Sequence, residues 1–173
     1  MSLAPLVQIC AAPGTGKTTV LPHLVARTSG EVVVDIDEIL TDGALLGVPI
    51  ASPAAAPVWP EYDRLWLRIA ALVRRSGHPV IMFIQVPDEG GFGPDPDDPS
   101  KLLLGWQVPD TVRGSRLRAR DWGPEQIDDA AADARLMAAM LPTERIVTSP
   151  EGEGPAVSAE RLLRAARRLV AES

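Results

Sequence analysis

One short stretch near the N-terminus limits the fold more than any other feature of the sequence. The apolar run Leu6–Cys10 leads into a loop of small residues, and an expected helix over residues 17–27 follows directly. A short, uninterrupted apolar run is typical of a strand that is buried on both faces. A buried strand, a glycine loop and a helix in direct succession therefore predict a parallel sheet covered by helices.

The loop itself has the composition of a phosphate-binding loop. It reads Ala11-Ala12-Pro13-Gly14-Thr15-Gly16-Lys17-Thr18-Thr19 and matches the pattern G-x-x-x-x-G-K-[ST] except at its first position, where alanine replaces glycine. Glycines in the loop let successive backbone amides turn inward toward phosphate oxygens. The helix that follows adds the positive end of its dipole. We therefore predict that residues 12–19 bind a nucleoside triphosphate.

Three side chains of this loop have predicted roles of their own. Lys17 supplies a cation to the β- and γ-phosphates, the hydroxyl of Thr18 is a ligand for Mg²⁺, and Thr19 contacts the α-phosphate. The alternative is a glycine-rich turn followed by Lys-Thr through chance. The agreement between the strand, the loop and the helix favours the phosphate-binding interpretation.

The rest of the chain continues the alternation of strands and helices. Further strands are expected over residues 31–35, 80–84, 102–106 and 145–147, and further helices over 60–76, 111–120, 124–141 and a final stretch capped by Ser158. Residues 41–58 and the acidic stretch 87–100 are expected to be irregular, and the acidic stretch mobile. We predict an α/β fold, with a five-stranded parallel sheet between helices on both faces and residues 1–173 in one domain.

Two acidic residues stand at the C-terminal end of the second predicted strand. In open parallel sheets this edge is where ligands bind. Alternate residues of a strand share a side, so we expect both Asp35 and Asp37 to face the cleft. Asp37 is the predicted base or acceptor-orienting group, and Asp35 a predicted part of the magnesium shell. The alternative is a helix N-cap followed by a solvated acid.

A group of arginines lies in the third predicted helix. Arg113, Arg116 and Arg120 are spaced i, i+3 and i+7, which places them on one helix face, whereas Arg118 points elsewhere. We predict that Arg116 and Arg120 contact the triphosphate and assist catalysis. The alternative is a solvated basic face.

Several weaker signals concern the second substrate and the nucleotide base. Arg64 and Arg68 are candidates for binding an anionic acceptor, although a solvated helix face is an equally good interpretation. Trp59 is a candidate wall of the acceptor pocket. Gln85 stands where many P-loop ATPases carry an aspartate for Mg²⁺, and Pro150 is a candidate to pack on the base.

Composition excludes several classes of protein. The net charge of −6 gives no general basic surface for nucleic acid, and a single cysteine excludes an internal disulfide and any multi-cysteine metal site. We see no signal peptide and no apolar run of the ~20 residues that span a bilayer. We expect a cytoplasmic monomer or homodimer that binds neither nucleic acid nor membranes.

These motifs together resemble the small P-loop kinases of the nucleoside-monophosphate-kinase and shikimate-kinase type. The chain is similar to their small-molecule phosphotransferase relatives, including the tunicamycin-resistance ATP-binding protein. Three pieces carry the resemblance: A-x-P-G-T-G-K-T-T at 11–19, D-x-D at 35–37, and R-L-R-A-R at 116–120. The resemblance implies a sheet order of 2-3-1-4-5, MgATP as donor, a lid over residues 113–128 and an acceptor-binding excursion over residues 41–68.

The leading hypothesis is therefore an ATP-dependent kinase that acts on a hydroxyl of a metabolite, nucleoside or antibiotic-like compound. Two alternatives stay open. One is a nucleotide kinase with phosphate as acceptor, and the other is an ATP-binding resistance or regulatory module that binds a ligand without phosphorylating it. A GTPase is disfavoured because the sequence has no N-K-x-D motif. Residues 42–58 match no acceptor signature, and an acidic stretch, Gln85 to Asp98, replaces the glycine-rich acceptor loop of shikimate kinases.

Overall fold

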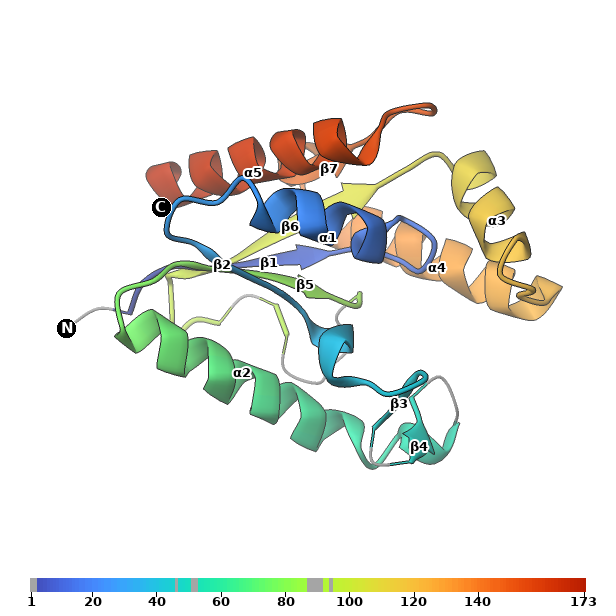
Figure 1. Ribbon diagram of the computed structural model, residues 1–173, viewed down its shortest axis with the longest axis horizontal. Coiled ribbons are helices and arrows are strands. Elements are labelled where there is room, and N and C mark those ends of the chain that lie inside the picture. Colours follow the sequence, from blue (N-terminus) through green and yellow to red (C-terminus); the bar gives the residue numbers. More distant parts are fainter. Residues whose placement is uncertain (1–2, 46, 51–52, 87–91, 94) are drawn as a thin grey trace.

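The computed structural model describes residues 3–45, 47–50, 53–86, 92–93 and 95–173. Five parallel strands form the central sheet in the order β2-β5-β1-β6-β7 (Figure 1). The strands are β1 (Leu6–Cys10), β2 (Val32–Asp35), β5 (Val80–Ile84), β6 (Lys101–Gln107) and β7 (Ile146–Thr148). Counted among the predicted strands alone, this is the order 2-3-1-4-5, so the predicted topology is confirmed.

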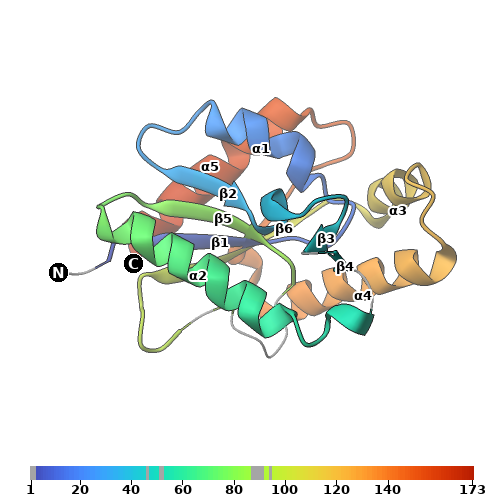
Figure 2. The same cartoon turned by 60° about the horizontal axis from the view of Figure 1, so that its bottom comes forward.

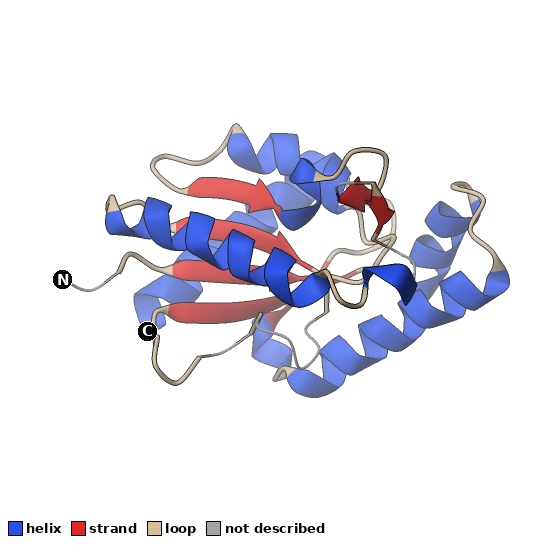
Figure 3. Ribbon diagram, turned by 90° about the horizontal axis from the view of Figure 1, so that it is seen from below, coloured by secondary structure: helices blue, strands red, loops and turns tan. Residues whose placement is uncertain are grey.

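Helices of the described residues form a layer on each face of the sheet, and one further helix lies beyond the carboxyl ends of the strands (Figures 1 and 3). The helices are α1 (Lys17–Val25), α2 (Trp59–Arg75), α3 (Asp110–Arg118), α4 (Pro124–Met140) and α5 (Pro155–Glu172). The crossovers through helices join parallel strands, as parallel pairing requires.

Alternation along the strands separates two apolar clusters. Val7 and Ile9 of β1 face α1 and α5, where they pack with Leu24 and Leu162. The neighbouring residues of β1 face α2 and α4, in the cluster of buried residues Leu6, Cys10, Tyr62, Trp66, Met82, Met137 and Leu141. Both faces of the central strands are thus covered, which explains why β1 and β5 are apolar at nearly every position.

The region expected to be irregular contains short elements of its own. The 3₁₀ helix η1 (Ile36–Ile39) follows β2 directly, the strands β3 (Ala44–Leu45) and β4 (Val48–Pro49) form a small hairpin, and η2 (Pro53–Ala55) precedes α2. Figure 2 shows this hairpin at the same end of the molecule as α3 and α4. A last 3₁₀ helix, η3 (Thr143–Arg145), leads into β7. Part of the mobile acidic stretch predicted over residues 87–100, namely 87–91 and 94, lies outside the described residues.

Two predicted boundaries are wrong. Ser158 does not cap α5: the helix begins at Pro155 after Gly154, and Ser158 is buried inside it, where its hydroxyl donates to Glu153 Oε1 at 2.9 Å. Proline at the first position suits a helix start because its missing amide would have no helical partner there. The helix that carries the arginines ends at Arg118, so Arg120 lies in the turn that follows. Within the described residues, no helix combines the length and the apolar character of a membrane span.

Candidate active site at the carboxyl edge of the sheet

The loop between β1 and α1 has the backbone of an anion cradle. Gly14 and Gly16 adopt positive φ angles of 81° and 114°, a region that favours glycine, and Gly16 immediately precedes the first residue of α1. The hydroxyl of the buried Thr15 donates to the carbonyl oxygen of Ala12 at 2.7 Å, which holds the turn closed. Ala11, at the position of the missing glycine, is buried, has no positive φ, and donates its amide to Ile84 O at 3.3 Å. Alanine is therefore compatible with this loop.

The side chain of Lys17 is held above the loop by polar contacts. Its Nζ donates to the carbonyl oxygen of Ala11 at 3.3 Å and to Oε1 of Gln85 at 3.4 Å. Gln85 in turn donates its Nε2 to Oδ2 of Asp37 at 3.2 Å. Three side chains from three different segments thus form one polar chain, with an ammonium at one end and a carboxylate at the other. The sequence identifies Lys17 and Asp37, but it gives no sign that Gln85 connects them.

Asp35, the last residue of β2, and Asp37 do not face the same side, contrary to the prediction. The strand ends at Asp35 and η1 begins at Ile36, so the alternation on which the prediction rests does not continue to Asp37. Asp35 is buried and caps η1: its Oδ1 accepts the amide of Asp37 at 3.2 Å, and Glu38 completes a capping box. Burial is the main cause that raises the pKa of Asp35 to about 6. The helix-cap interpretation is therefore correct for Asp35, whereas Asp37 lines a cavity.

Helix α3 packs its arginines against the outer side of the phosphate loop. Arg116 Nη1 donates to the carbonyl oxygens of Thr15 at 2.5 Å and Gly14 at 3.3 Å. Arg113 is buried and forms an ion pair of 2.6 Å with Asp110. The predicted row of three arginines on one helix face therefore splits into a buried residue, a loop contact and, at Arg120, a residue beyond the helix end.

Two cavities meet at the loop. The first, of about 540 Å³, contains the loop from Ala12 to Thr18 together with Asp37, Gln85 and Asp133. The second, of about 320 Å³, is lined by Thr19, Arg116, Ser149, Pro150 and Glu153, among others. Thr15, Gly16 and Arg120 line both. We call the first the acceptor cavity and the second the base cavity, after the roles that we propose for them below.

The base cavity has a wall of linked polar side chains. Trp106 Nε1 donates to Ser149 Oγ at 3.0 Å, and Ser149 Oγ donates to Ser158 Oγ at 3.0 Å. The chain of contacts ends at Glu153, whose pKa is lowered chiefly by its hydrogen bond from Arg161. Pro150 lies beside this wall and lines the cavity.

The other predicted site residues are placed unequally. Thr18 lines the acceptor cavity and its side chain is exposed, so its hydroxyl is accessible to an ion held by phosphates. Arg64 and Arg68 are exposed on α2 and line neither cavity, and Arg64 instead contacts Glu61. The part of the chain that the structure describes holds no group of three or more His, Cys, Asp or Glu that suits a metal ion.

Two cavity residues were missed by the sequence reasoning. Asp133 of α4 lines the acceptor cavity, and its pKa is raised, first by burial and then by Asp129. Trp122 lines the same cavity from the turn before α4. Trp122 belongs to the predicted lid, residues 113–128, but no place in a cavity was predicted for either residue, because each reaches the cavity only through the way α3 and α4 fold back onto the loop.

Comparisons with known proteins support the fold. No protein-family model and no curated protein sequence matches the chain. Among solved structures, it is similar to a sugar kinase from Janibacter sp. HTCC2649, at 19% identity over 97% of both chains with a TM-score of 0.59. It is similar to a tunicamycin resistance protein from Deinococcus radiodurans, at 19% identity over 95% of both chains with a TM-score of 0.56. A shikimate kinase from Acinetobacter baumannii gives 14% identity over 93% of this chain and 92% of its own, with a TM-score of 0.57. The chain therefore has the fold of the P-loop small-molecule kinases.

Proposed function

We propose that the protein is an ATP-dependent phosphotransferase that moves the γ-phosphate of ATP to a hydroxyl group of a small molecule. One observation carries the proposal: a base cavity and an acceptor cavity meet at the phosphate loop, and the acceptor cavity holds a carboxylate linked to Lys17. A protein that only binds ATP needs the base cavity and the loop. The acceptor cavity, with Asp37 in it, is what a two-substrate reaction requires.

The proposed reaction assigns a role to each group. The acceptor oxygen forms a bond to the γ-phosphorus while the bond between that phosphorus and the β,γ-bridging oxygen breaks, and ADP leaves. Asp37 orients the acceptor hydroxyl and receives its proton. Lys17 and Arg120 stabilise the charge on the phosphoryl oxygens. Magnesium, when bound, neutralises phosphate charge, with the hydroxyl of Thr18 as its protein ligand.

The similar solved structures support this reading. The Janibacter protein is a sugar kinase and the Acinetobacter protein is a shikimate kinase, and sugars and shikimate are small compounds with hydroxyl groups. Arg116 also belongs to the proposed machinery. Its guanidinium contacts the loop at Thr15, and its side chain lines the base cavity.

The proposal is tested by the change Asp37→Asn. An amide keeps the size of the side chain but accepts a proton poorly, so we expect kcat to fall by about 10²–10³ while the affinity for ATP stays within twofold. The measurement combines product formation by mass spectrometry, over a panel of small alcohols, with ATP binding by calorimetry. The control is Asp128→Asn, an exposed acid of α4 that lines neither cavity.

The outcomes separate the alternatives. Unchanged turnover in Asp37→Asn removes this residue from the reaction. ATP binding that is lost in Lys17→Ala, combined with no product from any alcohol of the panel, favours a module that binds a ligand without phosphorylating it.

A further inference from the structure

The residues that line the acceptor cavity indicate the chemistry of the acceptor molecule. This inference rests on the proposed phosphotransfer. We propose that the acceptor is a ring-bearing alcohol that carries no anionic group. The cavity's charge, its apolar wall and the sequence around it support this independently of the fold comparison.

The cations that line the cavity are confined to the phosphate end. Among the described lining residues they are Lys17 and Arg120. Lys17 is tied to the loop through Ala11 O, and Arg120 stands where the two cavities meet. Both positions serve the transferred phosphate. A triphosphate bound at the loop would use their charge.

The rest of the cavity is acidic or neutral. Asp37 and Asp133 line it, and a carboxylate or phosphate on the acceptor would meet their negative charge without a cation to offset it. The neighbouring sequence supplies no cation either. Residues 41–58 and 85–92, which adjoin or include the lining residues Leu40, Ile50, Gln85 and Val86 in the sequence, contain no Lys, Arg or His. Recognition of an anionic acceptor normally uses arginine or lysine.

The predicted anion-binding arginines do not change this result. Arg64 and Arg68 are exposed on α2 outside the cavity, and Arg64 is engaged with Glu61. Two arginines that would have marked an anionic acceptor thus have no place in the acceptor cavity.

The apolar wall of the cavity includes two aromatic rings. It consists of Leu40, Ile50, Trp59, Val86 and Trp122. The ring of Trp59 is held by an edge-to-face contact with Tyr62, with centroids 5.8 Å apart and an interplanar angle of 81°. Tyr62 is fixed in turn, because its hydroxyl donates to Ile36 O. A preorganised tryptophan surface binds the flat or apolar face of a ring at little cost in side-chain entropy.

Matched pairs of acceptors test the inference with the full chain, Mg²⁺ and a non-hydrolysable ATP analogue. Each pair joins an uncharged alcohol to an anionic counterpart: uridine and uridine 5′-monophosphate, thymidine and its monophosphate, and methyl shikimate and shikimate. Binding is measured by tryptophan fluorescence and calorimetry, which do not depend on turnover. We expect the uncharged member of at least one pair to bind at least tenfold more tightly than its counterpart, and no anionic member to bind more tightly than its partner.

Two variants sharpen the test. Trp59→Ala should weaken binding of the uncharged alcohol about tenfold, with ATP affinity and circular dichroism as controls for folding. Val86→Arg adds a cation to the apolar wall and should narrow or reverse the preference in each pair. Unchanged alcohol binding in folded Trp59→Ala, or an unchanged preference in folded Val86→Arg, would contradict the assignment.

The remaining outcomes keep this inference apart from the proposed reaction. Tighter binding of an anionic member, or no binding by any uncharged member, overturns the acceptor class. Binding of uncharged alcohols without any product under MgATP leaves the acceptor class intact and overturns the phosphotransfer. Phosphorylation of anionic acceptors but of no uncharged one overturns the acceptor class and leaves the phosphotransfer intact.

Discussion

At the scale of single residues, Gln85 connects Lys17 and Asp37, the two ends of the polar chain at the site. A glutamine can donate and accept at once, so its amide joins the ammonium of Lys17 to the carboxylate of Asp37. A carboxylate at this position would add a negative charge beside Asp37. The sequence shows only that an acid is missing after β5, whereas the structure shows that the amide holds Asp37 in place.

The change Gln85→Met removes both hydrogen bonds and keeps the size of the side chain. Each such bond is worth about 1 kcal/mol, so we expect kcat to fall roughly tenfold because Asp37 loses its anchor. The KM for ATP should change little. Steady-state kinetics measure the effect, with Gln107→Met as the control, since the Gln107 amide contacts Thr148 and lines neither cavity. Equal losses in the two variants would show that Gln85 has no positioning role.

At the scale of elements, the packing of α3 on the phosphate loop depends on a position without a side chain. A Cβ at Gly14 would lie 2.8 Å from Cγ of Arg113 and 2.9 Å from Cγ of Leu117, closer than carbon atoms approach without strain. The glycine is thus needed twice, once for its φ of 81° and once for the close approach of the helix. The loop motif predicts the first need, and only the contact with α3 reveals the second.

Gly14→Ala and Gly77→Ala separate these two needs. Gly77 ends α2 with a φ of 87°, and a Cβ there would meet nothing within 4 Å. We expect Gly77→Ala to cost about 1 kcal/mol of stability and to leave ATP binding unchanged. Gly14→Ala should cost more than this and weaken ATP binding more than tenfold, because α3 must move. Thermal unfolding and calorimetry measure both effects, and equal results for the two variants would rule out the packing argument.

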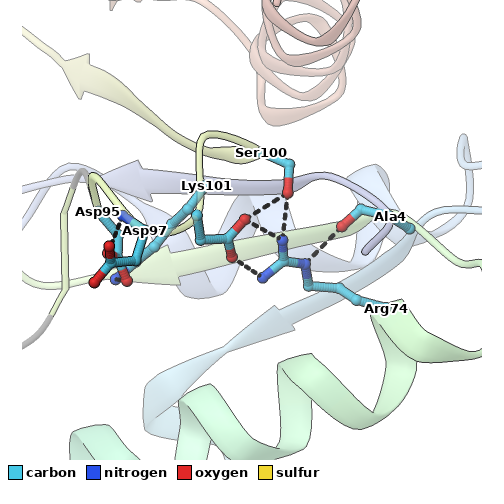
Figure 4. A network of polar contacts seen from close by, with 7 residues as sticks. Ala4, Arg74, Asp95, Asp97, Ser100 and Lys101 are labelled. Atoms are coloured by element: carbon cyan, nitrogen blue, oxygen red, sulfur yellow. Dashed lines mark hydrogen bonds and ion pairs between the residues drawn. The ribbon is translucent and has the colours of Figure 1, made fainter. Parts of the chain in front are cut away.

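At the scale of the whole molecule, the end of the sheet away from the site is fastened by one buried arginine. Figure 4 shows Arg74, in the last turn of α2, directed at Ala4 and Ser100, which precede β1 and β6. Arg74 donates to Ala4 O at 2.6 Å, to Ser100 Oγ at 2.7 Å, and to both carboxylate oxygens of Asp98 at 2.7 and 3.0 Å. The guanidinium is 4% exposed, so its charge needs this partner.

Asp98→Asn should therefore lower stability without affecting the reaction. We expect a loss of about 2–3 kcal/mol at pH 7, somewhat less than for a fully buried pair because Asp98 retains contact with water. Arg74 is the main cause that lowers the pKa of Asp98 to about 2, from an ordinary value of 3.8. Since this pKa is depressed in the folded state, the stabilisation is present above about pH 4 and is lost as the pH falls toward about 2.

Denaturant unfolding between pH 3 and pH 7 measures this difference. The gap between the wild type and Asp98→Asn should narrow toward pH 3, and the exposed Asp97→Asn should match the wild type throughout. A gap that stays constant with pH would contradict the ion-pair explanation, and a changed kcat would contradict the separation of this network from the site.

Much of this protein is determined by its sequence alone. The apolar runs of β1 and β5 predict buried parallel strands, and the loop from Ala11 to Thr19 predicts the phosphate cradle, because both depend on residues that are neighbours along the chain. The strand order follows once the loop is assigned to the fold that it typifies. These features needed no knowledge of distant contacts.

Only the tertiary structure decided which residues meet at the site. Alternation along a strand places Asp35 and Asp37 on the same side. Because η1 begins between them, Asp37 lines the cavity and Asp35 does not. Asp133 and Trp122 reach the same cavity through the fold of α3 and α4, and the spacing of Arg64 and Arg68 did not bring them there. Side-chain convergence over long sequence separations depends on how the helices dock, and no local pattern records that docking.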